Sequence, residues 1–347
     1  MKGVVRWTVL AIIVAGLVAG AIVAISLEGL SQPFSGYTGA EQFVELLPGD
    51  GTPVIARKLV DAGVVRDRWT FRVALWRTGA ARRLEAGEYR FDRPMSAVEV
   101  VLKLARGDVY LRAITFPEGL TVREMSEVFE ARGLGSAAAF VVAAKNGAAL
   151  VHDIDPAARD LEGYLFPETY SLSRHLGAAE LVRMMVGRFH QVFTVELRDA
   201  ASARGLTPRQ AVTVASLVEK ETAKADERAL VAGVYLRRLS LGMALQCDPT
   251  VIYALESRNQ YRGNLTHENL QVDSPYNTYR YPGLPPGPIA APGRSSLEAV
   301  AHAEPVDYLY FVSRNDGSHV FARTLDEHNR NVHTYQVEYF RQKRARH

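Results

Sequence analysis

The run LTPRQAVTVASLVEKET (residues 206–222) predicts an amphipathic helix with a well-defined start. Thr207 is a good N-cap residue, Pro208 suits the first helical position, and Gln210 stands three residues after the cap, as in a capping box. Four apolar residues then recur at the spacing of one helix face: Ala211, Val214, Ala215 and Val218. We therefore expect a helix that buries one apolar face and carries acidic residues at its carboxyl end.

Two glutamates, Glu219 and Glu221, follow this apolar stripe. Because they are two residues apart, about 200° around a helix, they cannot share a face. Glu219 comes four residues after Ala215, at the border of the buried face, where partial desolvation would raise its pKa and keep it protonated, as a general acid requires. Most glutamates on helices are solvated surface residues, so the spacing alone leaves that ordinary role open.

Composition limits the possible classes of protein. A chain of 347 residues is long enough for two domains with their own cores. The net charge is only +3 and the basic residues form no long run, which argues against nucleic acid as the main partner. Cys247 is the only cysteine, which excludes an intrachain disulfide and a cysteine metal cluster. We expect His319, His328 and His333 to be ordinary surface or hydrogen-bonding residues, because no HExxH-like spacing occurs.

Residues 8–27 are uncharged and mostly apolar, which is about the length needed to cross a bilayer of ~30 Å. Lys2 and Arg6 precede this segment and Glu28 follows it. The positive-inside rule therefore predicts a single-pass helix with residues 1–7 in the cytoplasm and the rest of the chain outside. A cleaved signal peptide is the alternative, although its apolar core is usually shorter, about 7–15 residues.

A second informative region is DLEGYLFPETY, residues 160–170. Its aromatic residues Tyr164, Phe166 and Tyr170 alternate with Glu162 and Glu168. Sugar sites combine flat aromatic faces with carboxylates or amides, so this loop is a candidate for glycan contact. The alternative is that the aromatic side chains pack a turn onto a core.

Two further runs carry exposed polar groups on predicted turns and loops. RLSLGMALQCDPTVIY (residues 238–253) contains Gln246 and Asp248 in a predicted turn at 246–250. SPYNTYRYPGLPPGPI (residues 274–289) is a long loop dense in proline and glycine, of a kind that is usually functional in a compact domain. Its polar and aromatic residues are candidates for lining a groove; they are Tyr276, Asn277 and Tyr279.

Taken together, three motifs resemble the endolytic murein transglycosylases, the MltG or YceG-like family. They are residues 160–170, the run 215–222 together with 238–253, and residues 274–289, and they follow the order of the family. The resemblance implies an α+β fold with a small LysM-like βααβ domain and a mixed α+β catalytic domain. The domains would be a cytoplasmic N-terminus at 1–7, an anchor at 8–27, a linker at 28–42, the LysM-like domain at 43–112 and the catalytic domain at 113–347. Cys247 and the make-up of the loops are minor departures from the family pattern.

Sequence patterns also predict local elements around these motifs. Within the LysM-like region we expect a strand at 43–47, helices at 52–62 and 67–78, and a strand at 88–91. Whether this module contacts glycan or serves as a spacer stays open. Further along, we expect an amphipathic helix at 177–204, a β-hairpin formed by 307–314 and 319–324, and a final helix at 325–342.

The resemblance implies a lyase that cleaves the MurNAc–GlcNAc bond of nascent glycan strands and leaves 1,6-anhydroMurNAc ends. One glutamate would act first as general acid and then as base. The resemblance places it at Glu219, with Glu221 as the alternative. The expected substrate-binding residues are Tyr279, Asn277, Gln246, Asp248, Tyr276, Glu162 and Glu221.

The resemblance also implies a setting for this reaction. No cofactor or metal is expected, and the partners are peptidoglycan strands and cell-wall synthases of the divisome or elongasome. The protein would lie in the bacterial inner membrane with its catalytic domain in the periplasm, and would act in cell-wall assembly and strand termination. Two alternatives stay open: a muramidase that uses water, and a non-catalytic glycan-binding scaffold.

Overall fold

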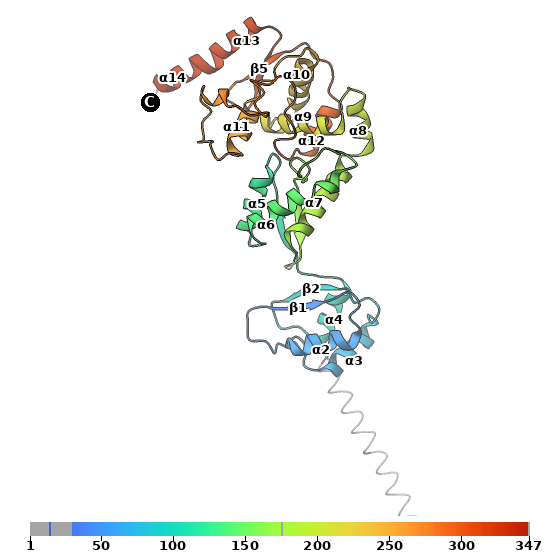
Figure 1. Cartoon of the computed structure of the whole chain (residues 1–347). Coiled ribbons are helices and arrows are strands. Elements are labelled where there is room, and N and C mark those ends of the chain that lie inside the picture. Colours follow the sequence, from blue (N-terminus) through green and yellow to red (C-terminus); the bar gives the residue numbers. More distant parts are fainter. Residues whose placement is uncertain (1–13, 15–29, 175, 346–347) are drawn as a thin grey trace, which may run out of the picture. The chain divides into compact units, whose positions relative to one another are not determined.

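The structure is a computed structural model that describes residues 14, 30–174 and 176–345 (Figure 1). The described residues form two compact units, one up to Arg112 with 171–174, the other comprising 113–170 and 176 onward. Both combine helices with small β-sheets, which confirms the α+β class. The predicted membrane span at 8–27 lies outside the described residues, apart from Val14. In the described ranges, no helix has the length and apolar content needed to cross a bilayer.

The first unit has the predicted order of strand, helix, helix and strand. Its elements are β1 (Gln42–Leu46), α2 (Thr52–Asp61), α3 (Arg68–Thr78) and β2 (Gly87–Phe91), followed by α4 (Ala97–Ala105). β1 and β2 are antiparallel, with Gln42 opposite Phe91 and Leu46 opposite Gly87. Two of the helices, α3 and α4, begin at side-chain caps, because Asp67 accepts from Thr70 N and Ser96 forms a capping box with Glu99.

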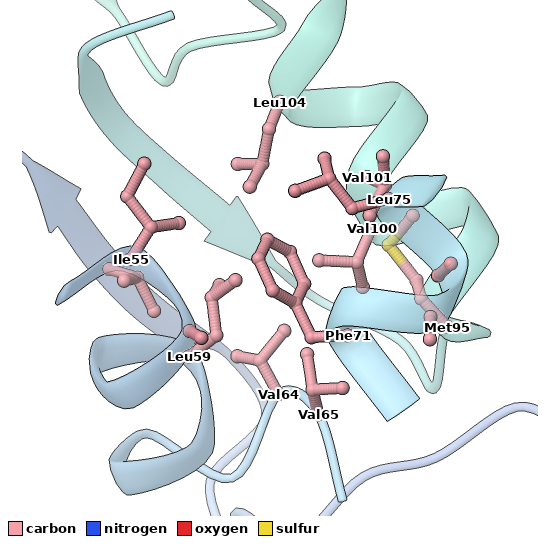
Figure 2. Packing of buried hydrophobic residues seen from close by; sticks show 14 of the residues in the cluster. Ile55, Leu59, Val64, Val65, Phe71, Leu75, Met95, Val100, Val101 and Leu104 are labelled. Carbon is pink, nitrogen blue, oxygen red and sulfur yellow. The ribbon is translucent and has the colours of Figure 1, made fainter. Parts of the chain in front are cut away.

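Phe71 lies at the centre of the core of this unit (Figure 2). Apolar side chains from α2 and α4 surround it, including Leu59 and Val100, and all three are completely buried. α3 thus contributes Phe71 and Leu75 to the core, while its opposite side needs no partner for folding.

The second unit begins with two helices that precede the long α7. The next elements along the chain are β3 (Arg112–Thr115), α5 (Val122–Ala131), α6 (Ala137–Asn146), the 3-10 turn η1 (Ala148–Val151), β4 (Thr169–Leu172), α7 (Ala178–Val192) and α8 (Val195–Ser202). Of these, only Arg112 in β3 and residues 171–172 in β4 belong to the first unit. β3 and β4 form a two-stranded sheet. The single helix predicted at 177–204 is wrong. Phe193 leaves the helical conformation, and Thr194 starts a new helix because its side chain accepts a hydrogen bond from Leu197 N.

The central helix of the second unit is α9 (Pro208–Glu221), which has the predicted capping box of Thr207 and Gln210. Its neighbours are α8, α10 (Arg228–Ser240), α11 (Asp248–Glu256) and α12 (Arg294–Ala301). Because these four helices surround α9, every residue from 211 to 218 is buried, and not one face alone as predicted. α11 begins at Asp248, so the turn predicted at 246–250 ends earlier than expected.

The remaining elements form the C-terminal part of the second unit. They are the 3-10 turn η2 (Asn269–Gln271), β5 (Tyr310–Ser313), β6 (His319–Ala322), α13 (Leu325–Val332), the π-helical η3 (His333–Glu338) and α14 (Tyr339–Ala345). The predicted hairpin is confirmed, because β5 and β6 pair antiparallel with Ser313 opposite His319. This pairing brings His319 to the start of β6 in the second unit.

Candidate active site

Glu219 lies at the end of α9, where two hydrogen-bond donors and a guanidinium surround its carboxyl group. Its Oε2 atom accepts hydrogen bonds from Gly293 N at 2.9 Å and Ser296 Oγ at 2.7 Å. Gly293 is the N-cap of α12, so the carboxylate lies where the helix dipole is positive. The Arg228 guanidinium is 3.7 Å from Oε1, and the Glu219 side chain is only 6% exposed. These contacts tie α9 to α12 through a buried carboxylate.

A second acidic side chain, Glu118, packs against the same place. A Cβ atom at Gly293 would come within 1.8 Å of Oε1 of Glu118, so a larger residue at this position would displace the Glu118 side chain. Burial and the nearby charge of Glu219 raise the pKa of Glu118, while Arg228 lowers it. Arg228 is 3.9 Å from Glu118. Arg228 therefore lies within ion-pair distance of two carboxyl groups, those of Glu118 and Glu219.

Glu221 points to a different side of α9, as the helical spacing requires. Its Oε2 atom accepts hydrogen bonds from Tyr235 OH at 3.1 Å and Cys247 Sγ at 3.7 Å. Burial raises the pKa of Glu221, and the negative charge of Asp248 raises it further. The carboxyl group lines a cavity of about 450 Å³. Glu221 thus combines access to a cavity with surroundings that favour the protonated acid.

Three of the residues expected from the sequence line this cavity with Glu221: Gln246, Asp248 and Tyr279. Tyr279 OH donates to Asp248 Oδ1 at 2.5 Å, which fixes both side chains. Gln246 adopts a left-handed backbone conformation with φ of 52°. Non-glycine residues rarely adopt this conformation, which is costly and concentrates at functional sites. The cavity therefore contains two carboxyl groups, those of Glu221 and Asp248, and several oriented polar groups.

Other residues of the cavity were not predicted, including Arg238, His319 and His328. Arg238 is 7% exposed and its guanidinium donates to the carbonyls of Leu309 and Leu245. It therefore fixes the wall of the cavity. These residues come from helices and strands far apart in the sequence, and their spacing does not mark them as one site, although Arg238 begins the run 238–253.

His319 is held by Glu227, which precedes α10. The imidazole Nδ1 donates to Glu227 Oε2 at 2.7 Å, and the backbone N donates to Oε1 at 2.9 Å. Burial opposes ionisation of Glu227, but these hydrogen bonds hold its pKa below the ordinary value. Thr222, next to Glu221, donates to the same carboxylate at 3.3 Å. Glu227 thus links the end of α9 to β6. Because Nδ1 of His319 is bound to Glu227, its other ring nitrogen, Nε2, does not take part in this contact.

Asn277 is one of the expected site residues that lie elsewhere. It is completely buried, and its Nδ2 donates to the carbonyls of Leu270 and Val272 at 2.9 and 2.8 Å. Its Oδ1 accepts from Tyr279 N at 3.0 Å. Asn277 therefore holds the loop that presents Tyr279 and does not itself line the cavity.

Tyr276 and Glu162 line a separate cavity of about 580 Å³. Two of its charged residues, Asp155 and Arg209, are paired with each other, and Tyr164 OH also donates to Asp155. Arg159 and Asp160 line the cavity as well. Burial raises the pKa of Glu162 to about 8, although hydrogen bonds from Val122 N and Tyr253 OH oppose the shift. This cavity is larger than the one at Glu221, and neither glutamate at the end of α9 lines it.

The aromatic residues of 160–170 do not form the expected sugar platform. Tyr164, Phe166 and Tyr170 are between 1% and 6% exposed, and Tyr164 packs edge-on against Phe189. Their rings belong to the core, which corrects the expectation of glycan contact in favour of the packing alternative. Within the described ranges, no three His, Cys, Asp or Glu side chains are grouped as metal ligands.

Comparison with known proteins gives consistent results. The model of the YceG-like family matches residues 44–334. A Bacillus subtilis protein named endolytic murein transglycosylase is 29% identical over 308 residues, covering 84% of each chain. A Streptococcus pneumoniae protein of the same name is 30% identical over 278 residues, and the match covers 72% of this chain and half of that one. The crystal structure of a YceG-like protein from Listeria monocytogenes is 30% identical, with a TM-score of 0.57, and the match covers 84% of this chain and 98% of that one.

Proposed function

This chain belongs to the YceG-like family, and on that premise we propose that it is an endolytic murein transglycosylase with Glu221 as its catalytic acid and base. The bond cleaved is the MurNAc–GlcNAc linkage of nascent glycan strands, and the product carries a 1,6-anhydroMurNAc end. Cleavage within growing strands would terminate them during cell-wall assembly. The names of the relatives support the class of reaction, and the cavity at Glu221 supports the choice of residue.

The observation that carries the proposal is the difference between the two carboxyl groups at the end of α9. A general acid needs a proton and access to the substrate. Glu221 has a raised pKa and lines a cavity. Glu219 is bound by Gly293 N and Ser296 Oγ, and it is not among the residues that line this cavity. The sequence-based assignment to Glu219 stays a prediction, and the geometry favours Glu221.

The reaction needs only this one carboxyl group. Glu221 donates its proton to the glycosidic oxygen as the bond from that oxygen to C1 of MurNAc breaks. The resulting carboxylate takes the proton of the C6 hydroxyl, and O6 forms a bond to C1. Glu221 is then protonated again, and no water is consumed. While Glu221 is ionised, the donors Tyr235 OH and Cys247 Sγ stabilise its charge.

The polar groups of the cavity orient the sugar. Tyr279 and Asp248 hold each other at 2.5 Å and present a fixed hydrogen-bonding pair. Gln246 offers an amide from a strained backbone position. Such preorganised groups reduce the cost of bringing the C6 hydroxyl and C1 together.

Hydrolysis is a second candidate because Asp248 is another carboxyl group in the same cavity. A hydrolase uses one carboxyl as acid and the other as nucleophile or base. In this chain Asp248 accepts a hydrogen bond from Tyr279, which favours an orienting role over activation of water.

The rest of the chain would place this site at the cell wall. Residues 8–27 would anchor the protein in the membrane, and this part of the proposal is based on their apolar sequence alone. The βααβ order of the first unit supports a LysM-like module at 43–112. Cell-wall synthases stay the expected protein partners.

The test is digestion of purified peptidoglycan, and of membrane-linked nascent strands, by the full-length protein in detergent, with mass spectrometry of the products. Wild type should give 1,6-anhydroMurNAc ends and Glu221→Gln should give none. Reducing ends from wild type would show a hydrolase. Absence of cleavage of both substrates by a folded wild-type protein would support the scaffold alternative and refute the proposal.

A further inference from the structure

An exposed face of α3 in the first unit carries two tryptophans that the core does not use. Trp69 is 64% exposed and Trp76 is 81% exposed, the highest values for large hydrophobic side chains in the described residues. Exposed tryptophans of this degree are unusual in soluble domains and mark interaction surfaces.

The helical geometry puts both rings on one side of α3. Seven residues at about 100° each place Trp69 and Trp76 about 20° apart around the axis, with Arg72 beside them. The buried residues of α3 lie on the opposite side, where Phe71 and Leu75 point into the core (Figure 2). The tryptophan face therefore lies on a regular helix and is not part of the core of the unit.

Positive charge surrounds the two rings. Residues 66–83 contain a single acidic residue, Asp67, which accepts hydrogen bonds from Thr70 at the start of α3. The same segment contains six arginines, namely Arg66, Arg68, Arg72, Arg77, Arg82 and Arg83. All six are exposed. We call Trp69, Trp76 and these arginines the α3 face.

We propose that the α3 face docks on an anionic lipid surface. Tryptophan rings settle at the level of lipid headgroups, and arginines near an anionic leaflet are attracted to it. A helix with such a face can lie in the plane of the interface. A glycan would instead need a concave site with polar groups that match sugar hydroxyls. The cavities described above are lined by residues of the second unit.

This docking is independent of the proposed catalytic activity, and intrinsic fluorescence can test it. The chain has three tryptophans, and the third, Trp7, lies outside the described residues. In full-length Trp7→Phe, all tryptophan emission therefore comes from the α3 face. The protein is mixed with vesicles of phosphatidylcholine, or of phosphatidylcholine and phosphatidylglycerol at 3:1, each containing brominated lipid.

Docking predicts a blue shift and quenching by brominated lipid in the anionic vesicles, both weakened by salt. Little quenching is expected in phosphatidylcholine alone, even if residues 8–27 insert there. Equal quenching in both vesicles, or emission of fully exposed tryptophan in the anionic ones, would overturn the proposal. A blue shift with soluble peptidoglycan fragments but not with vesicles would assign the face to glycan and would also overturn it.

Charge variants distinguish docking through the α3 face from non-specific electrostatic attraction of the whole protein to the vesicles. Arg72→Glu with Arg77→Glu should lower the ratio of docked to free α3 at least about 30-fold, since each lost arginine accounts for about five-fold. Arg57→Glu with Arg183→Glu changes the net charge equally at exposed positions outside the α3 face and should leave quenching within about two-fold. Equal effects of the two pairs would refute a specific docking face. Circular dichroism establishes that each variant is folded.

Discussion

Replacing the two glutamates of α9 one at a time should separate catalysis from stability. Glu219→Gln removes the charge from a side chain that accepts from Gly293 N and Ser296 Oγ and faces Arg228. The glutamine can keep one acceptor oxygen, so the loss is that of a charge-assisted contact at a helix N-terminus. We expect it to cost about 2 kcal/mol of unfolding free energy. For a unit of this size, that lowers the Tm by about 4–8 °C.

Glu221→Gln should have the opposite pattern. Its partner Tyr235 can still donate to an amide oxygen, and a neutral amide suits a site that favours a neutral acid. We therefore expect a change in Tm below about 2 °C, because the loss of a well-matched hydrogen bond is avoided. Losing a general acid reduces a rate by about 100- to 10,000-fold. Because Glu221 would serve both steps, the rate should fall at the upper end of this range.

The assay measures the rate of formation of anhydro ends and the thermal unfolding curve on the same preparations. Glu219→Gln should keep its rate within a few-fold at a temperature where it is folded. An inactive Glu219→Gln with wild-type Tm, together with an active Glu221→Gln, would refute the reasoning. It would move the acid to Glu219 and leave the cavity at Glu221 without a catalytic role.

Three further changes test other parts of the structure. His319→Gln removes an imidazole that, when it is protonated, lowers the pKa of Glu221. This pKa should therefore rise, and the alkaline limb of the pH–rate profile should move to higher pH. An unchanged limb, or one moved to lower pH, would contradict the geometry. Asn277→Ala leaves the buried carbonyls of Leu270 and Val272 without their donor. The unfolding free energy measured in urea titrations should fall by about 2–4 kcal/mol. A loss below about 1 kcal/mol would argue that water replaces the amide. Phe71→Ala creates a cavity in the core of the first unit and should destabilise that unit by about 3–5 kcal/mol. Calorimetry should show this loss in the unfolding transition of the first unit, while the rate of strand cleavage stays near that of the wild type.

The sequence alone determined the local elements of this protein. The capping box at Thr207 and Gln210, the βααβ order of the first unit and the hairpin of β5 and β6 all follow from short-range patterns. Short-range patterns also required Glu219 and Glu221 to face different sides of α9, because helical geometry depends only on spacing. The break at Phe193 was missed, since an apolar stripe that continues past a cap resembles one helix.

Tertiary structure decided what each side of α9 meets. Gly293 and Ser296, which bind Glu219, lie 74 and 77 residues further along the chain. Asp248 and His319, which influence the pKa of Glu221, come from other elements again. Such long-range contacts set burial and charge around a carboxyl group, and spacing within one helix does not contain them. The sequence therefore supplied two candidate acids, and only the packing of distant segments distinguished the one that caps a helix from the one that lines a cavity.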